Sequence, residues 1–535
     1  MTARGRVAEF TGGVPRAWIL LAIVVVATGL RLYSFRGYWG TDDGEYALLA
    51  NAVVQGTYDE FVDENYTRQF NAPAHLPYRV ALIAPLALLF RIFGISEATL
   101  VAYPLLISVL GVVLVFACGR YFFGARAGLI AAALWAIVPG DVDISTSFLP
   151  DGVASFYASL AVVVVLCLRS GESRPRSSLF LGGLAAGALF GVSWLSKESV
   201  AYFVPFCGIL IAIDAKRDFR SALPLWSGVA VASAGILAAE MAFYQIAAGD
   251  FMLRMHENER SFVQTRAYLF YEGSRFGWPA GGSHARALVK RLLLDGPGTI
   301  ALNAQFLYLP LVGLVAAARG LYWRDRSFLL PALWLGTLAF MYNFMTCSFA
   351  AYTPLVLLER YLHPIILPAA VLTAGLIVRL MERASEAAST NARGERLFWG
   401  AAVTAAVVLV AGHSTFRELR DLERVQPMYE VRALAGLVGP GDTIYTDPLS
   451  SKALEFYWKY PARTGIVDFE GMERAGVQPH SHVLVDKNRL DWLDVNVSMW
   501  LTKEYGYHEP EFSQAPPETW DVVWRNRYAT LYRVN

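Results

Sequence analysis

The residues best suited to chemistry are acidic side chains that stand directly beside apolar segments. Segment 40–46 (GTDDGEY) carries Asp42, Asp43 and Glu45 and closes on Tyr46, just after the first apolar run. A carboxylate held against an acceptor hydroxyl can take its proton during attack, so this group suggests a general base with substrate-binding neighbours. Helix capping is the alternative interpretation, because acids in a first turn interact favourably with the helix dipole.

Two more ionisable residues lie at the ends of apolar runs. Asp151, in segment 148–151 (FLPD), opens a later run, and capping is again the alternative. Lys197, in segment 194–198 (WLSKE), is one of seven lysines and lies between two apolar runs. Ionisable groups at such positions are usually functional, although an ion pair between Lys197 and Glu198 at the membrane surface would also explain them.

Segment 359–364 (ERYLHP) brings a guanidinium and a phenol to the start of another apolar run. Arg360 and Tyr361 are suited to binding a phosphate oxygen, and anchoring at the membrane interface is the alternative. His75, in segment 73–78 (PAHLPY), is a further candidate for substrate binding. It forms no spaced metal motif with His256 or His284, so no metal-ligating residue is predicted, although acids of this kind are compatible with a divalent metal.

The composition indicates what must position these residues. Of 535 residues, 55% are hydrophobic and 17% charged, and the mean hydropathy is +0.39. Soluble proteins have roughly a quarter charged residues, so the chain is predicted to be an integral membrane protein. The net charge of +1 argues against a nucleic-acid partner. Membrane lipids are therefore the expected surroundings.

Apolar runs predict about eleven membrane spans. They lie near 17–35, 98–118, 127–139, 152–168, 178–195, 199–213, 222–247, 299–318, 327–345, 361–380 and 397–412.

Basic residues predict the orientation of these spans. Every second connection carries arginine or lysine, whereas the short loops 140–150 and 346–359 have neither. Because basic loops stay cytoplasmic, Asp42, Asp151 and Lys197 are expected on the outer side. The pattern requires that the apolar run 76–95 does not cross, so it is predicted to be an interfacial or re-entrant helix, with a second interfacial helix over residues 43–55. We expect a multi-pass protein of the inner (plasma) membrane.

The last part of the chain is more polar than the rest. Short strands are predicted at 443–446 and 481–485, and a hairpin over 520–534 that turns at Asn526. Two domains are therefore predicted, a transmembrane domain over 1–412 and a small extramembrane α/β domain over 413–535.

The order of these features over residues 16–380 resembles the GT-C superfamily of glycosyltransferases that use polyprenyl-phosphate sugars, such as aminoarabinose, Rgt-type and protein O-mannosyltransferases. Segment 42–46 resembles the family's Asp-Glu-x-x-Tyr element, and 75–78 a degenerate start of its interfacial helix. Residues 119–124 (GRYFFG) resemble its Gly-Arg-x-Phe-Gly turn, Pro150-Asp151 the opening of its fourth span, and 360–364 its Arg-Tyr-Leu-Leu-Pro.

The resemblance implies an inverting hexosyl- or pentosyltransferase of the cell envelope that modifies lipid A or polysaccharide. Asp42 inherits the catalytic role and Asp151 is expected to assist it. A polyprenyl-phosphate sugar is the implied donor, and a lipid, a glycan or a protein the acceptor. A protein O-mannosyltransferase is the nearest alternative, and a transporter or flippase of lipid-linked sugars is the alternative from another class, although charges grouped at the outer face favour an enzyme.

Overall fold

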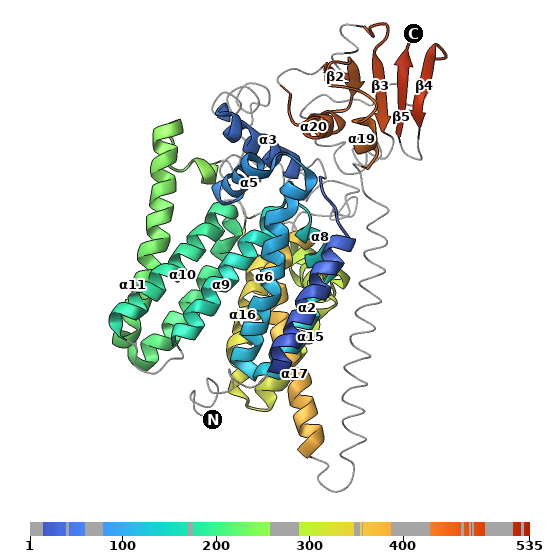
Figure 1. Ribbon diagram of the computed structural model, residues 1–535. Coiled ribbons are helices and arrows are strands. Elements are labelled where there is room, and N and C mark those ends of the chain that lie inside the picture. Colours follow the sequence, from blue (N-terminus) through green and yellow to red (C-terminus); the bar gives the residue numbers. More distant parts are fainter. Residues whose placement is uncertain are drawn as a thin grey trace. The chain divides into compact units, whose positions relative to one another are not determined.

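The computed structural model divides the chain into two compact units (Figure 1). Unit 1 comprises Met1–Phe35, Phe70–Leu82 and Pro104–Asp421, and unit 2 comprises Arg36–Gln69, Ile83–Tyr103 and Leu422–Asn535. The structure describes residues 14–38, 42–58, 79–169, 175–256, 288–346, 352, 354–355, 357–386, 429–461, 465–469, 472, 476–486, 517–525 and 529–535. The predicted domain boundary at residue 413 lies outside the described residues and stays a prediction.

Unit 1 is built from helices. Its longer helices are α2 (Val14–Tyr33), the greater part of α6 (Glu97–Phe123), α7 (Ala125–Ala136), α9 (Pro150–Arg169), α10 (Arg176–Ser196), α11 (Val204–Ala248), α15 (Leu309–Tyr322), α16 (Leu329–Phe344) and α17 (Ile366–Glu386). The shorter helical turns are α8 (Pro139–Ser145), η3 (Glu198–Phe203), η4 (Arg291–Asp295), α14 (Gly296–Ala301), η5 (Ala304–Phe306), η6 (Arg326–Phe328) and η7 (Glu359–Ile365).

These helices confirm a polytopic membrane fold. Within the described residues, seven helices are long and apolar enough to cross a membrane, or eight if α7 and α8, which meet at a bend of 62°, form one span. Asp218 interrupts α11 with non-helical backbone angles, between the predicted runs 199–213 and 222–247. The predicted run 397–412 lies outside the described residues, so the number of spans stays a prediction.

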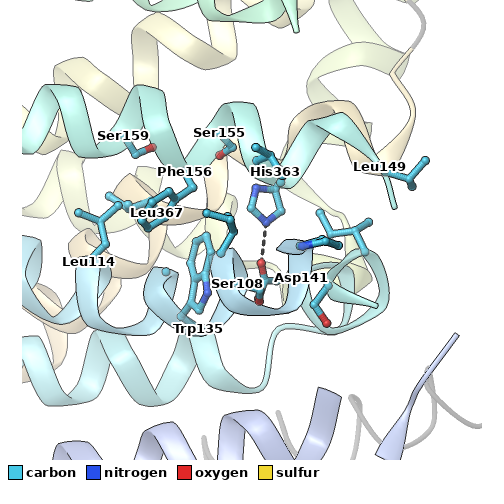
Figure 2. Close-up of a pocket in the computed structure, with 17 residues that line it drawn as sticks. Ser108, Leu114, Trp135, Asp141, Leu149, Ser155, Phe156, Ser159, His363 and Leu367 are labelled. Atoms are coloured by element: carbon cyan, nitrogen blue, oxygen red, sulfur yellow. Dashed lines mark hydrogen bonds and ion pairs between the residues drawn. The ribbon is translucent and has the colours of Figure 1, made fainter. Parts of the chain in front are cut away.

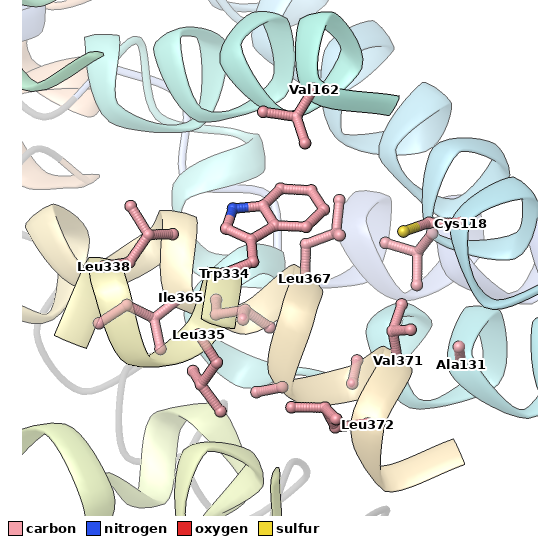
Figure 3. Packing of buried hydrophobic residues seen from close by; sticks show 14 of the residues in the cluster. Cys118, Ala131, Val162, Trp334, Leu335, Leu338, Ile365, Leu367, Val371 and Leu372 are labelled. Atoms are coloured by element: carbon pink, nitrogen blue, oxygen red, sulfur yellow. The ribbon is translucent and has the colours of Figure 1, made fainter. Parts of the chain in front are cut away.

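The core of unit 1 lies where α16 and α17 pack against α6, α7 and α9 (Figure 3). Trp334 is fully buried there and stacks on Phe206, with 5.7 Å between the ring centroids. Helices α6 and α7 approach closely because Gly128 has no side chain, since a Cβ there would lie 2.7 Å from the carbonyl oxygen of Phe116. Small residues at such contacts allow membrane helices to pack by their backbones.

Unit 2 contains the two predicted non-crossing helices and the small C-terminal domain. Helix α3 (Asp42–Gln55) matches the predicted interfacial helix, and α5 (Val80–Phe93) occupies most of the predicted run 76–95. Each has 14 residues and is therefore about 21 Å long, shorter than the apolar layer of roughly 30 Å. Their length is consistent with helices that do not cross the membrane.

The C-terminal domain is the expected α/β structure. Helices α19 (Tyr429–Leu434) and α20 (Pro448–Tyr457) accompany a five-stranded sheet in the order β2-β1-β3-β5-β4. The strands are β1 (Ile444–Thr446), β2 (Ile466–Asp468), β3 (His482–Asp486), β4 (Trp520–Arg525) and β5 (Ala529–Val534). Strand β1 pairs in parallel with β2 and β3, and β4 and β5 pair antiparallel as the predicted hairpin. Asn526, its predicted turn residue, lies outside the described residues.

Candidate functional site

The centre of the candidate site in unit 1 is a buried ion pair under an aromatic ring. Lys197 Nζ lies 2.5 Å from Asp151 Oδ1 and 3.8 Å from the centre of the Tyr361 ring. Asp151 is 4% exposed and Lys197 8% exposed. Three elements far apart in sequence meet here, because Asp151 opens α9, Lys197 joins α10 to η3, and Tyr361 belongs to η7. The sequence therefore identified three residues that lie in contact.

Local structure explains why these residues stand where they do. Pro150 begins α9, a position that suits proline because its missing N–H needs no partner there. Asp151 follows in the first turn, where the helix dipole favours an acid. Its Oδ2 atom is buried without a hydrogen-bond partner among the described residues. Asp151 thus has a favourable helix position and an acceptor atom left over for a ligand.

Glu198 belongs to a separate charge cluster. Its two carboxylate oxygens lie 3.7 Å from Arg79 Nη2 and 3.9 Å from Arg254 Nη1, whereas Lys197 pairs with Asp151. Arg254 also lies 2.6 Å from the buried Glu240 of α11. The ion pair considered between Lys197 and Glu198 is therefore not the arrangement seen. Glu198 orders arginines beside the site.

A second buried network in unit 1 includes Ser108, Asp141 and His363, which line a pocket shown in Figure 2. Asp141 of α8 accepts hydrogen bonds from Arg31 of α2 and from Ser108 (2.6 Å), and its Oδ1 atom lies 2.8 Å from His363 Nε2. Arg31 is fully buried, and Asp141 is 1% exposed. The segment 140–150 was expected to be a loop, and this expectation is wrong at its start, where α8 carries Asp141 inward.

This network fixes the turn that carries two predicted ligands of phosphate. His363 packs edge-on against Trp135, at 5.3 Å between ring centroids, and lies on η7 with Arg360 and Tyr361. The Arg360 guanidinium lies 5.3 Å from the centre of the Tyr361 ring. A short 3-10 helix has few hydrogen bonds of its own, so its position depends on such side-chain contacts. His363 therefore anchors η7.

In unit 2 the acidic turn forms the start of α3. Asp42 is its first residue, Asp43 is 1% exposed, and Tyr46 is fully buried. Glu45 forms an ion pair with Lys452 of α20. The acids thus occupy the helix start that the capping interpretation required, and Asp42 and Glu45 share a face three residues apart. Capping and chemistry remain compatible for this turn.

Some predicted features fall outside the geometry described above. His75 lies outside the described residues. Within the described part of the chain, no three His, Cys, Asp or Glu side chains gather as a metal site would require. Arg31, Glu240 and Lys452 were not predicted from the sequence. Arg31 and Glu240 could have been predicted, because a charged residue inside an apolar span needs a partner. Nothing in the local sequence distinguishes Lys452.

Comparisons with known proteins agree with this architecture. Residues 80–248 match the family model described as dolichyl-phosphate-mannose-protein mannosyltransferase. A comparison with curated protein sequences found no match.

Solved structures match nearly the whole chain. Apo ArnT from Cupriavidus metallidurans has a TM-score of 0.57 at 15% identity, covering 97% of this chain and 98% of ArnT. ArnT bound to undecaprenyl phosphate gives 0.56 at 16% identity, with the same coverage. The apo oligosaccharyltransferase from Archaeoglobus fulgidus gives 0.55 at 15% identity, covering 88% of this chain and 69% of that protein. The resemblance to the GT-C superfamily is thereby confirmed at the level of the fold.

Proposed function

We propose that this protein is a membrane glycosyltransferase that moves a sugar from a polyprenyl-phosphate donor to an acceptor hydroxyl. The family model over residues 80–248 supports a glycosyltransferase. The similar ArnT structure with undecaprenyl phosphate and an archaeal oligosaccharyltransferase structure with dolichol phosphate support a lipid phosphate as the carrier. A fold alone does not specify activity, because one fold can carry many kinds of site.

The observation that carries the proposal is the buried cation of Lys197 between Asp151 and Tyr361. A lysine held at 8% exposure in a membrane protein costs free energy, which function explains better than stability. Its ammonium and the Arg360 guanidinium beside Tyr361 suit a phosphate group that gains negative charge as it leaves. The unpartnered Oδ2 of Asp151 suits a hydroxyl of the sugar or of the acceptor.

The proposed reaction is a single displacement with inversion. The acceptor oxygen attacks the anomeric carbon and forms the new glycosidic bond, while the bond from that carbon to the phosphate oxygen breaks. Asp42 takes the hydroxyl proton, and the electron pair of the broken bond leaves with the polyprenyl phosphate. Asp43, Glu45 and Tyr46 would bind substrate beside the base, and Glu198 and His75 are also proposed to bind substrate. A divalent metal is not needed for these steps.

The acceptor is proposed to be a lipid or a glycan. The chain and ArnT cover each other almost completely, at 97% and 98%, whereas the chain covers 69% of the oligosaccharyltransferase. A protein acceptor is the second candidate, which the description of the matched family model favours. The outer side of the plasma membrane is the proposed location of the site, because the loops on the other side are the basic ones.

The test is radiolabel transfer from defined polyprenyl-phosphate sugars in membranes that contain the full chain. Asp42→Asn keeps the size and capping ability of the side chain but removes its basicity. We expect it to lower transfer by at least about a thousandfold while donor binding and expression persist. Asp521→Asn, which changes an exposed acid of β4, is the matched control and should retain most activity. Near wild-type transfer by Asp42→Asn, with Glu45→Gln inactive, would move the base to Glu45.

If no sugar is transferred but labelled lipid crosses vesicles that contain the protein, the transporter alternative is correct. Asp42→Asn would then leave lipid movement unchanged. Transfer to added peptides rather than to lipid or glycan acceptors would establish the protein acceptor.

A further inference from the structure

The C-terminal domain contacts the acidic turn of α3 directly. Lys452 and Phe456 lie four residues apart on α20 and therefore on one face of that helix. Lys452 forms its ion pair with Glu45, whose side chain is 17% exposed. Phe456 stacks on Tyr38, with 4.3 Å between the ring centroids and 22° between the rings. One face of α20 thus contacts residues on both sides of Asp42 in the chain.

Close packing makes this contact specific. Tyr38 is 1% exposed and lies against Gly44 of α3. A Cβ at Gly44 would lie 2.6 Å from the Tyr38 hydroxyl oxygen, so a larger residue there would have to displace the buried Tyr38 ring. Tyr38 is therefore held between α3 and Phe456, and a displacement of α20 would be transmitted to the acidic turn.

A second set of contacts ties the same domain to the start of α6. Glu97 Oε1 accepts hydrogen bonds from the Tyr38 backbone N–H (3.2 Å) and from the Tyr457 hydroxyl (3.1 Å). Arg432 of α19 lies 2.9 Å from the other carboxylate oxygen of Glu97. Tyr38 thus contacts the C-terminal domain twice, directly through Phe456 and indirectly through Glu97.

Charge gives the Lys452 contact a chemical consequence. Asp42, Asp43 and Glu45 would repel one another if all were ionised, and repulsion raises the pKa of a carboxyl group. Burial lowers the pKa of Lys452 to about 8, although the charge of Glu455 acts in the opposite direction. Below that pH the Lys452 ammonium neutralises Glu45 and thereby favours the ionised form of the neighbouring carboxyl groups. The other charged group on this part of α20 is Glu455. Burial, Glu455 and Asp43 together hold the pKa of Tyr460 well above its usual value, so that phenol stays neutral.

We propose that Lys452 is a positioning residue for the transfer reaction, through which the C-terminal domain orients the α3 turn and keeps its base ionised. This inference rests on the proposed function, because it assumes that Asp42 is the base. It gives the C-terminal domain a role in the active site through Glu45.

The first measurement tests the contact without using activity. Thermal unfolding of the purified full chain in detergent is compared for Glu45→Gln, Lys452→Met and the double variant. We expect the double variant to unfold no earlier than the less stable single variant, because each single change already breaks the pair. Losses that add in the double variant would overturn the inference. Coupled losses in a protein that transfers no sugar would refute the proposed function but not the contact.

The second measurement tests the role. Lys452→Met should lower kcat for transfer about tenfold while the donor KM stays within about twofold, since the donor phosphate is held elsewhere. The acidic limb of the pH profile of kcat for Lys452→Met should move to higher pH by roughly half to one unit, because loss of a cation raises the pKa of the base. Lys452→Arg should restore most of the kcat and most of the wild-type pH profile.

The matched control is Lys459→Met, which removes an exposed lysine of the same domain. It should behave as wild type in kcat and in pH profile. If Lys452→Met matches this control, or raises donor KM with kcat unchanged, Lys452 does not position the base.

Discussion

Replacing Asp141 by Asn tests whether the buried network beside the site depends on charge. The substitution keeps the shape of the side chain and leaves an acceptor for His363 or Ser108. It removes the negative charge that faces the Arg31 guanidinium, which is fully buried. The Arg31 guanidinium would then remain inside the helix bundle without its carboxylate partner.

The expected cost follows from this burial. Breaking a buried ion pair by removing one partner costs about 3–5 kcal/mol, because the other charge stays desolvated. The entropy of unfolding grows with chain length, so in a chain of 535 residues each kcal/mol lowers Tm by roughly 1 °C, and Tm should fall by roughly 3–5 °C. Tryptophan fluorescence during heating of the purified protein in detergent gives this value.

Two comparisons separate charge from packing. Ser108→Ala removes one neutral hydroxyl from the same network and should cost about 1–3 kcal/mol. The double variant Arg31→Met with Asp141→Leu replaces the ion pair by apolar side chains and should recover most of the lost stability. The recovery is incomplete because His363 loses its hydrogen bond to Asp141. A Tm for Asp141→Asn no lower than that of Ser108→Ala, or a double variant as unstable as Asp141→Asn, would refute the reasoning.

Two further predictions concern the donor and the membrane. Arg360→Lys keeps the charge but loses the planar fork, so the donor KM should rise about tenfold with Tm unchanged, and an unchanged KM would support membrane anchoring as its role. Reporter fusions after Arg220, in a basic connection, and after Gln478, in the C-terminal domain, should report opposite sides of the membrane, whereas equal signals would refute the orientation.

Much of the fold was predictable because apolar runs in a membrane protein have few alternatives. Backbone groups in lipid must be paired within the segment, so a long apolar run becomes a helix. The non-crossing helix at 80–93 was inferred from the basic loops, and its length is consistent with that inference. The break at Asp218 also agrees with the polar residues between two predicted runs. The expected loop at 140–150 is wrong because α8 brings Asp141 to partners on other helices.

The site was predictable in residue type but not in pairing. Asp151, Lys197 and Tyr361 were selected because each stands at the end of an apolar run. Which charge meets which depends on helix rotation and packing, and the sequence neighbour Glu198 was a reasonable partner for Lys197 before the arginines beside it were known. The ion pair between Lys452 and Glu45 could not be predicted from the sequence, because the two residues lie more than 400 positions apart.

The pairing of Lys197 with Asp151 also bears on how such a site would accelerate transfer. In the proposed reaction the donor phosphate carries one negative charge before the glycosidic bond breaks and approaches two as the polyprenyl phosphate leaves. A fixed cation therefore stabilises the departing group more than the bound donor, which lowers the barrier instead of only tightening binding. Without substrate, the same ammonium would be a desolvated charge among membrane helices, and Asp151 compensates it at 2.5 Å. The Asp151 carboxylate thus stabilises the buried Lys197 ammonium before substrate binds. Its Oδ1 atom holds Lys197, and its Oδ2 atom stays available to orient a hydroxyl.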